Sequence, residues 1–312
     1  MPEASPRPQR RVRVLGGRYS MSASMTMASC RVASCVGTPL GTHHHRAGAR
    51  CLSRRSVHRR ISAPSALPGV ETPWSPSGED MDAVIDELTA RLAAAAFYGD
   101  GDGDARVFVG IAGSPGSGKS TLASAVRDKL NAAAGDDVAV VFPMDGFHYY
   151  RSQLADPAMF PDPEAARARR GAPWTFDARA FVDRVRAARS NTDSPTSVPA
   201  FDHQVHDPEE DAITILPSHK VILVEGNYLL LPDEPWRELW DGDGALLDER
   251  WFVDTAVDDA MTRVMGRHVA VGRSAEEAKS RADGNDRPNG EMVWAARGNA
   301  DVHVPSYEWE GA

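Results

Sequence analysis

The first 70 residues lack acidic side chains almost completely, because Glu3 is the only carboxylate before Glu71. The same stretch is rich in arginine and serine, and no periodic apolar pattern begins before about residue 78. A segment of this composition cannot bury enough apolar surface to fold. We therefore predict that residues 1–78 are a disordered basic extension. Its composition is typical of a mitochondrial transit peptide, and a dispensable extension before a start at Met81 is the alternative.

Cysteine is scarce and confined to that extension, at Cys30, Cys35 and Cys51. The remainder therefore has no disulfide framework, which suits a reducing compartment. We expect a cytoplasmic protein, or a mitochondrial one if residues 1–78 are a transit peptide. No apolar run approaches the roughly 18 residues that a membrane span needs, so no membrane partner is expected.

Basic residues are also sparse relative to acidic ones over most of the chain. The net charge is −9 although the extension is strongly basic, so residues 79–312 are strongly acidic. Nucleic-acid binding requires a basic face for the phosphates. We therefore expect no nucleic-acid partner. The sequence gives no indication of oligomeric state.

One glycine-rich stretch, Gly-Ser-Pro-Gly-Ser-Gly-Lys-Ser at 113–120, has the spacing of a phosphate-binding P-loop. A buried-strand pattern precedes it at 106–112, and a helical pattern follows it from Ser120. Glycines let the backbone approach phosphate oxygens, and the helix start supplies unpaired N–H groups. Lys119 adds charge, and Ser120 offers a hydroxyl to Mg²⁺. The predicted triphosphate-binding residues are Gly113, Ser114, Gly116, Ser117, Gly118, Lys119, Ser120 and Thr121.

Two carboxylates follow predicted strands. Asp145 comes directly after the apolar stretch 137–144, and Glu225 comes directly after the run Val-Ile-Leu-Val at 221–224. Carboxyl ends of strands in an α/β sheet border the ligand crevice. There Asp145 could accept a proton from a substrate hydroxyl, and Glu225 could lie near Mg²⁺ or its water shell. A plain turn before Gly146 is the alternative interpretation of Asp145.

Further polar groups follow in the second half of the chain. Arg263 and Arg267 are one helical turn apart and share a face, so they could cover a triphosphate or form a solvated basic face. Phe201, Asp202 and His203 end a short extended stretch at 198–203 and could line a substrate pocket. A surface turn would explain His203 equally well.

Together these motifs resemble the phosphoribulokinase/uridine kinase family of P-loop kinases, which is related to bacterial pantothenate kinase. Besides the P-loop, the resemblance rests on Met-Asp-Gly-Phe-His (144–148), Arg-Gly-Ala-Pro-Trp-Thr-Phe-Asp (170–177), Pro-Ala-Phe-Asp-His (199–203), Val-Glu-Gly-Asn-Tyr-Leu-Leu-Leu (224–231) and Arg-Val-Met-Gly-Arg-His (263–268). The motifs occur in order over roughly 105–300. Uridine kinases usually have Phe-Tyr after the catalytic Asp, whereas Gly-Phe-His-Tyr follows here.

The resemblance implies a three-layer α/β P-loop NTPase fold for residues 79–312, with a mostly parallel sheet and a helical lid. It implies ATP and Mg²⁺ as cofactors and transfer of the γ-phosphoryl group to a hydroxyl of a nucleoside, a sugar or a pantothenate-like metabolite. Catalysis would fall to Lys119, Asp145, Glu225, Arg263 and Arg267, with His148 on the substrate side and Ser120 and Glu225 at the metal. The alternative function is a nucleotide-dependent switch or assembly factor. No guanine-specifying Asn-Lys-x-Asp motif supports that alternative.

Overall fold

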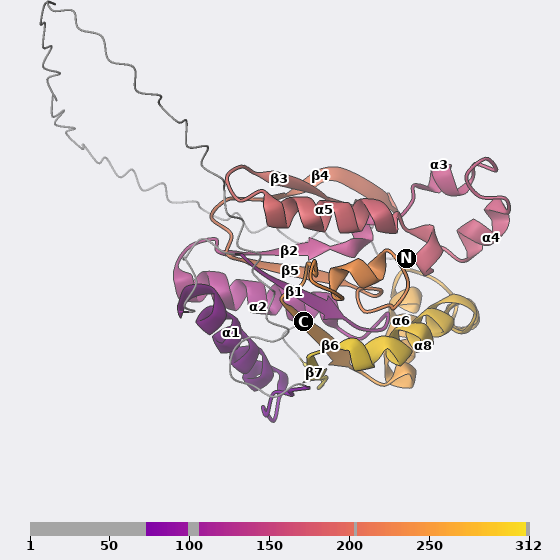
Figure 1. Ribbon diagram of the computed structural model, residues 1–312. Coiled ribbons are helices and arrows are strands. Elements are labelled where there is room, and N and C mark those ends of the chain that lie inside the picture. The colour runs from indigo at the N-terminus through magenta and orange to yellow at the C-terminus, as the bar shows by residue number, and fades with distance from the viewer. Residues whose placement is uncertain (1–72, 99–105, 203–204, 310–312) are drawn as a thin grey trace, which may run out of the picture. The chain divides into compact units, whose positions relative to one another are not determined.

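The computed structural model describes residues 73–98, 106–202 and 205–309 (Figure 1). Its centre is a five-stranded sheet in the order β2-β5-β1-β6-β7, in which every pairing is parallel. The strands are β1 (Val107–Ala112), β2 (Ala139–Pro143), β5 (Val221–Gly226), β6 (Glu249–Asp254) and β7 (Val302–Pro305). The expected parallel α/β sheet is therefore confirmed.

Two layers cover the sheet, because its strands are apolar on both sides. Alternate residues of β1 and β5 face opposite ways, so Phe108 and Ile222 join one core cluster and Val109 and Leu223 join the other. Helices α1 (Met81–Tyr98) and α2 (Lys119–Ala134) close one face, and α5 (Ala178–Ser190) lies on the other (Figure 1). The chain is thus three layers deep.

A β-hairpin lies beside α5, formed by β3 (Thr196–Asp202) and β4 (Asp207–Ile215). The sequence pattern predicted only an extended piece at 198–203 and missed β4, whose acidic first half is exposed. The hairpin runs directly over the turn after β2: a Cβ built on Gly146 would lie 2.1 Å from the Pro199 carbonyl oxygen. Only glycine allows this approach, which joins the hairpin to the turn that carries Asp145.

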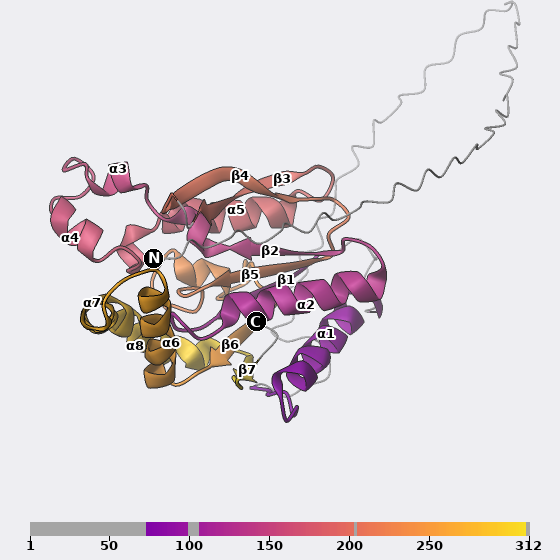
Figure 2. The same cartoon turned by 180° about the vertical axis from the view of Figure 1, so that it is seen from behind.

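Two helical segments flank the carboxyl ends of the strands (Figure 2). The arm, defined here as residues 149–176, includes α3 (Arg151–Leu154) and α4 (Pro163–Ala168). The lid contains α6 (Val257–Ala270), α7 (Ala275–Arg281) and α8 (Arg287–Ala295). Residues 285–290 are of types that favour turns, but they are helical. The π-helical residues Ala282–Asp286 continue directly into α8, in which Pro288 is the second residue.

Residues just before the expected boundary at 78 pack on the sheet. The Trp74 N–H donates to the Asp301 carbonyl and the His303 N–H donates to the Trp74 carbonyl, both at 2.8 Å. Ser77 also bonds to Glu87. Residues 73–78 therefore belong with the body, while the rest of the predicted extension lies outside the described residues. Within the described part, no helix is long and apolar enough to cross a membrane.

Candidate active site

The loop between β1 and α2 has the backbone of a phosphate cradle. Gly116 and Gly118 have φ angles of 85° and 94°, which favour glycine. A Cβ on Gly113 would lie 2.4 Å from Ser117 Oγ, and one on Gly116 would lie 2.4 Å from the Ala260 carbonyl oxygen of α6. The loop therefore curls tightly at the start of α2, against the lid. Glycine is required in it both by the positive φ angles and by the lack of space for a Cβ.

The loop serines differ in what they offer a ligand. The Ser114 hydroxyl is buried and donates to the Gly290 carbonyl oxygen of α8 at 3.1 Å. Ser117 Oγ is buried without a hydrogen-bond partner among the described residues. The Ser117 N–H donates to the Ser114 carbonyl oxygen at 3.0 Å, so it is already used within the loop. Ser120 is exposed, and its hydroxyl donates to Glu225 Oε2 at 3.2 Å, so two side-chain oxygens lie side by side.

A hollow of about 440 Å³ lies beside the loop. Lys119, Ser120 and Thr121 form one wall, and Arg263 and Arg267 form another. Arg263 is held against the loop, since its Nη1 donates to Ser306 Oγ at 3.3 Å and reaches the Ser117 carbonyl oxygen at 3.5 Å. The predicted donor residues therefore come together.

The chain's end completes the same hollow in a way the sequence did not indicate. Tyr307, Glu308 and Trp309 line it together with Met81 at the start of α1. No local pattern marks these residues, because only the fold brings them beside the loop.

Glu225 is the penultimate residue of β5, which lies between β1 and β2. It pairs with Ile111 of β1 on one side and Pro143 of β2 on the other. Burial raises the pKa of this carboxyl, the Lys119 ammonium lowers it, the Asp145 carboxylate raises it and the Ser120 hydrogen bond lowers it. The net pKa is above the ordinary value. Lys119, Asp145 and Glu225 therefore form one electrostatic cluster at the carboxyl ends of three adjacent strands.

The predicted substrate residues are partly brought together. His148 Nδ1 lies 2.8 Å from the Asp145 carbonyl oxygen, and its ring lies against Phe176 and Phe201 at centroid distances of 3.9 and 4.8 Å. Asp202 shapes the hairpin tip, where it accepts from the N–H groups of Val205 and His206. His203 lies outside the described residues. Asp145, His148 and Phe201 thus form one wall.

Two residues that the sequence did not single out organise this wall. Arg170 lies over the Phe201 ring at 5.4 Å and donates to the Tyr149 carbonyl oxygen and to Asp207 Oδ1. Tyr228 is buried and its hydroxyl donates to the Gly171 carbonyl oxygen. Both residues belong to motifs on which the family resemblance rests. Those motifs were the sequence signal that could have identified them.

Comparison with known proteins agrees with this geometry. No protein-family profile matches the chain. A Schizosaccharomyces pombe protein named "putative uridine kinase" is 41% identical over 186 residues, which cover 59% of this chain and 76% of that protein. The chain belongs to the phosphoribulokinase/uridine kinase-like family of P-loop kinases. This P-loop kinase is also 31% identical to the Kluyveromyces lactis "ATP-dependent kinase YFH7" over 261 residues, 69% of this chain and 72% of that one.

Among solved structures, this P-loop kinase resembles a Silicibacter protein described as a "putative fructose transport system kinase". The TM-score is 0.60 and the identity 31%, and the match covers 72% of this chain and 99% of that chain. Family membership makes the chain a phosphotransferase.

Proposed function

We propose that this P-loop kinase transfers the γ-phosphoryl group of ATP to a hydroxyl of a small metabolite. The observation that carries the proposal is the grouping of Lys119, Asp145 and Glu225 around the loop. A nucleotide switch needs a phosphate loop and a metal site, but it has no use for a second carboxylate beside a separate aromatic wall. The ATP-dependent relative supports the choice of donor.

The residues near Ser120 fit Mg²⁺. A hydroxyl and a carboxylate 3.2 Å apart are hard oxygen donors, and Mg²⁺ commonly takes one or two protein ligands besides water and phosphate oxygens. In the described part, no group of three acidic, His or Cys side chains forms a protein-only cage. Bound Mg²⁺ would neutralise charge on the transferring phosphates.

The chain's own residues then divide the work. Loop N–H groups and Lys119 hold the phosphates in position. Asp145 takes the proton of the acceptor hydroxyl. The acceptor's oxygen bonds to the γ-phosphorus while the bond between that phosphorus and the ADP oxygen breaks. Arg263 and Arg267 stabilise charge on the transferring group. Little covalent chemistry is asked of the protein.

The test is a panel of metabolites incubated with the purified protein, ATP and Mg²⁺. ATP consumption is followed and phosphorylated products are identified by mass spectrometry. We expect consumption that depends on an acceptor and is lowered at least about 1,000-fold in Lys119→Ala. Arg237→Gln, which removes a surface cation paired with Asp241, is the control and should keep full activity. Hydrolysis that ignores every acceptor would instead indicate the nucleotide switch.

A further inference from the structure

Arg170 is the residue through which the arm holds the hairpin. Its side chain is 14% exposed, and its two terminal nitrogens make three hydrogen bonds. Nη1 donates to the His206 carbonyl oxygen at 2.5 Å, while Nη2 donates to the Tyr149 carbonyl oxygen at 2.9 Å and to Asp207 Oδ1 at 2.8 Å. Tyr149 opens the arm, and His206 and Asp207 lie where β4 begins. One planar group therefore joins the two segments, in a way that a point charge cannot.

The same guanidinium lies over the acceptor wall, which we define as Asp145, His148 and Phe201. Its Cζ is 5.4 Å from the centre of the Phe201 ring, within the range of cation–π attraction. The Phe201 ring centre is 4.8 Å from that of His148, and His148 Nδ1 is 2.8 Å from the Asp145 carbonyl oxygen. A continuous series of contacts thus connects Arg170 with the residue that we propose as the base.

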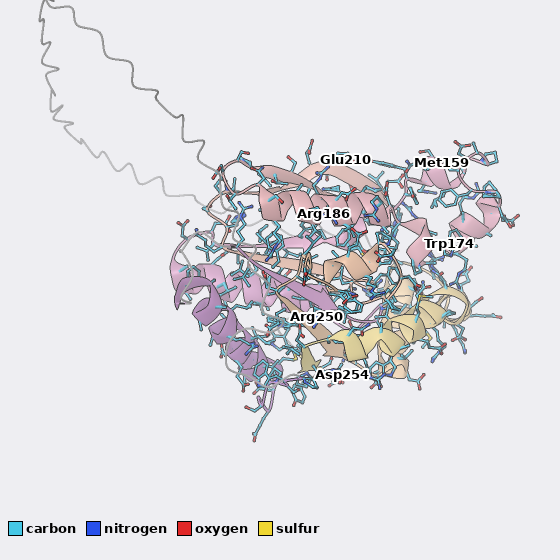
Figure 3. All side chains as sticks on the ribbon, in the orientation of Figure 1. Met159, Trp174, Arg186, Glu210, Arg250 and Asp254 are labelled. Atoms are coloured by element: carbon cyan, nitrogen blue, oxygen red, sulfur yellow. The ribbon has the colours of Figure 1, made fainter. Side chains whose placement is uncertain are left out.

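The hairpin and the turn that carries Asp145 touch at the level of the backbone. A Cβ built on Gly146 would lie 2.1 Å from the Pro199 carbonyl oxygen, so there is no space between them. Farther along β4, the Tyr150 hydroxyl of the arm donates to Glu210 Oε1 at 2.7 Å, and Figure 3 shows Glu210 on this strand. A hairpin that loses its bonds to the arm therefore shifts directly against the turn.

The backbone from which this side chain extends is anchored on three sides. Asn285 Nδ2 of the lid donates to the Arg170 carbonyl oxygen at 3.0 Å. At the next residue, the Gly171 N–H donates to Thr175 Oγ1 at 2.9 Å, and the Gly171 carbonyl oxygen accepts from the Tyr228 hydroxyl. Asn285, Thr175 and Tyr228 are all buried. The guanidinium therefore acts from a rigid base, which is what positioning a second group requires.

Two features of these contacts lower the stability of the fold. Arg170 Nε is buried and has no hydrogen-bond partner among the described residues. His206, whose carbonyl oxygen accepts from Nη1, has a positive φ of 60° although it is not glycine. An unsatisfied buried donor and a left-handed residue other than glycine each cost free energy, and such strained groups cluster at functional sites. A contribution to stability alone therefore does not account for Arg170.

We propose that Arg170 is the positioning residue of the acceptor site: its guanidinium holds the acceptor wall in place and thereby sets how well the acceptor hydroxyl is aligned with Asp145. Arg170 does not line the hollow beside the P-loop, so its influence is confined to the acceptor side. It acts through the wall and is not itself a catalytic residue. This inference rests on the proposed kinase function.

The experiment measures steady-state kinetics of the full chain with ATP, Mg²⁺ and the metabolite panel, which includes uridine, fructose and pantothenate, one for each predicted class. With the acceptor that the wild type uses best, Arg170→Gln should lower kcat/KM for the acceptor about 100-fold, because small misplacements of a positioned group are costly in rate. KM for ATP should stay within about twofold of the wild-type value. Arg170→Lys keeps the charge beside Asp207 but not the planar fork, so its kcat/KM should remain at least about tenfold below the wild type.

Arg184→Gln is the matched control. Arg184 of α5 also donates from Nη1 to a hairpin carbonyl, that of Ser197 near the start of β3, whereas Phe201 is near the end of that strand. Loss of this bond should lower Tm, as loss of Arg170 does, but leave kcat/KM for the acceptor at the wild-type value. Calorimetric titration with a non-hydrolysable ATP analogue should give the wild-type Kd for both glutamine variants, because neither touches the donor side.

The failures are distinguishable. Wild-type kcat/KM in Arg170→Gln, an equal loss in Arg184→Gln, or full recovery in Arg170→Lys would overturn the positioning role and leave the kinase function standing. A loss of ATP affinity as large as the loss of kcat/KM for the acceptor would overturn it as well. ATP consumption that no acceptor of the panel stimulates in the wild type would contradict the kinase function, and this inference with it.

Discussion

At the scale of single residues, Glu225 is the most constrained group of the site. It is 6% exposed, and its carboxylate faces the Lys119 ammonium, the Ser120 hydroxyl and the charge of Asp145. Burial is the largest influence and disfavours the ionised form, so the protein keeps a proton on this carboxyl to higher pH than the unfolded chain does. The ionised carboxylate therefore lowers the stability of the folded protein, although the proposed site uses it.

The first prediction concerns this loss of stability. The pKa of Glu225 is raised in the folded state above its ordinary 4.5, so ionisation destabilises the folded protein as the pH rises through the window above 4.5. Glu225→Gln has no charge there. We expect its Tm, measured without nucleotide, to exceed that of the wild type by an amount that grows from about pH 4.5 towards neutrality. A Tm difference that does not change with pH would contradict this.

The second prediction concerns Asp145 as the proton acceptor. Asp145→Asn keeps the shape of the side chain and removes its basicity, so kcat should fall by roughly 100- to 10,000-fold while KM for ATP stays close to the wild-type value. Steady-state kinetics with the best acceptor of the panel measure both. Asp136→Asn, an exposed substitution after α2, is the control. Full kcat in Asp145→Asn would remove the assignment.

At the scale of elements, the contact between the P-loop and α6 joins the donor site to the lid. Gly116 has a φ of 85°, and any Cβ there meets the Ala260 carbonyl oxygen. Ser114 makes a second contact with the lid through the carbonyl of Gly290 in α8. The loop is therefore supported by two lid helices as well as by its own strand and helix.

The third prediction tests this junction with two glycines of similar backbone conformation. Gly116→Ala must displace α6, so we expect a loss of about 2–3 kcal/mol in stability and at least tenfold weaker ATP binding. Gly135→Ala also has a positive φ, of 67°, but its Cβ would meet no atom within 4 Å. It should cost about 1 kcal/mol and leave ATP binding unchanged. Thermal unfolding and calorimetric titration of ATP measure both. Equal effects would show that contact with α6 does not matter.

The elements were predictable where the pattern was local. Buried parallel strands such as Val221–Gly226 appear in the sequence as nearly continuous apolar runs. The P-loop is recognised by the spacing of its glycines and lysine. β4 was missed because Asp207–Ile215 carries the exposed acidic residues Glu209, Glu210 and Asp211 and pairs only with β3. Asn285–Gly290 is helical although its residues are of turn-forming types, because tertiary contacts bury Asn285 and Asn289 and override their local preference.

At the scale of the whole molecule, the body begins before the helix that first shows an apolar pattern. Trp74 lies against Arg91 at 5.0 Å and packs with the core cluster under α1. Its two backbone hydrogen bonds extend the sheet beyond β7. The segment acts as an additional edge for the sheet.

The fourth prediction follows from that edge. A protein truncated to residues 73–312 should keep these contacts, whereas one truncated to 79–312 loses Trp74 and its hydrogen bonds. We expect the shorter protein to unfold at a Tm lower by roughly 5–10 °C. Circular dichroism melts of the two proteins give the comparison. If their Tm values agree, residues 73–78 do not contribute to the body.

The two halves of the site differ in how far the sequence could reveal them. The donor half is contiguous from Gly113 to Thr121, so its chemistry can be recognised along the chain. The acceptor half that we propose is assembled from the arm, the hairpin and the turn after β2, and the contacts of Arg170 and Tyr228 appear only in the three-dimensional structure. Acceptor specificity is therefore a property of the assembled fold.

The position of β1 in the sheet has a consequence for the protein during its synthesis. β1 is the strand that leads into the phosphate loop, yet its two neighbours, β5 and β6, are made more than 100 residues later. A ribosome-bound chain that ends before Asp254 lacks a partner for one side of β1. The nucleotide site therefore cannot form before β6 has been made. ATP binding can stabilise only a chain that has been translated past β6.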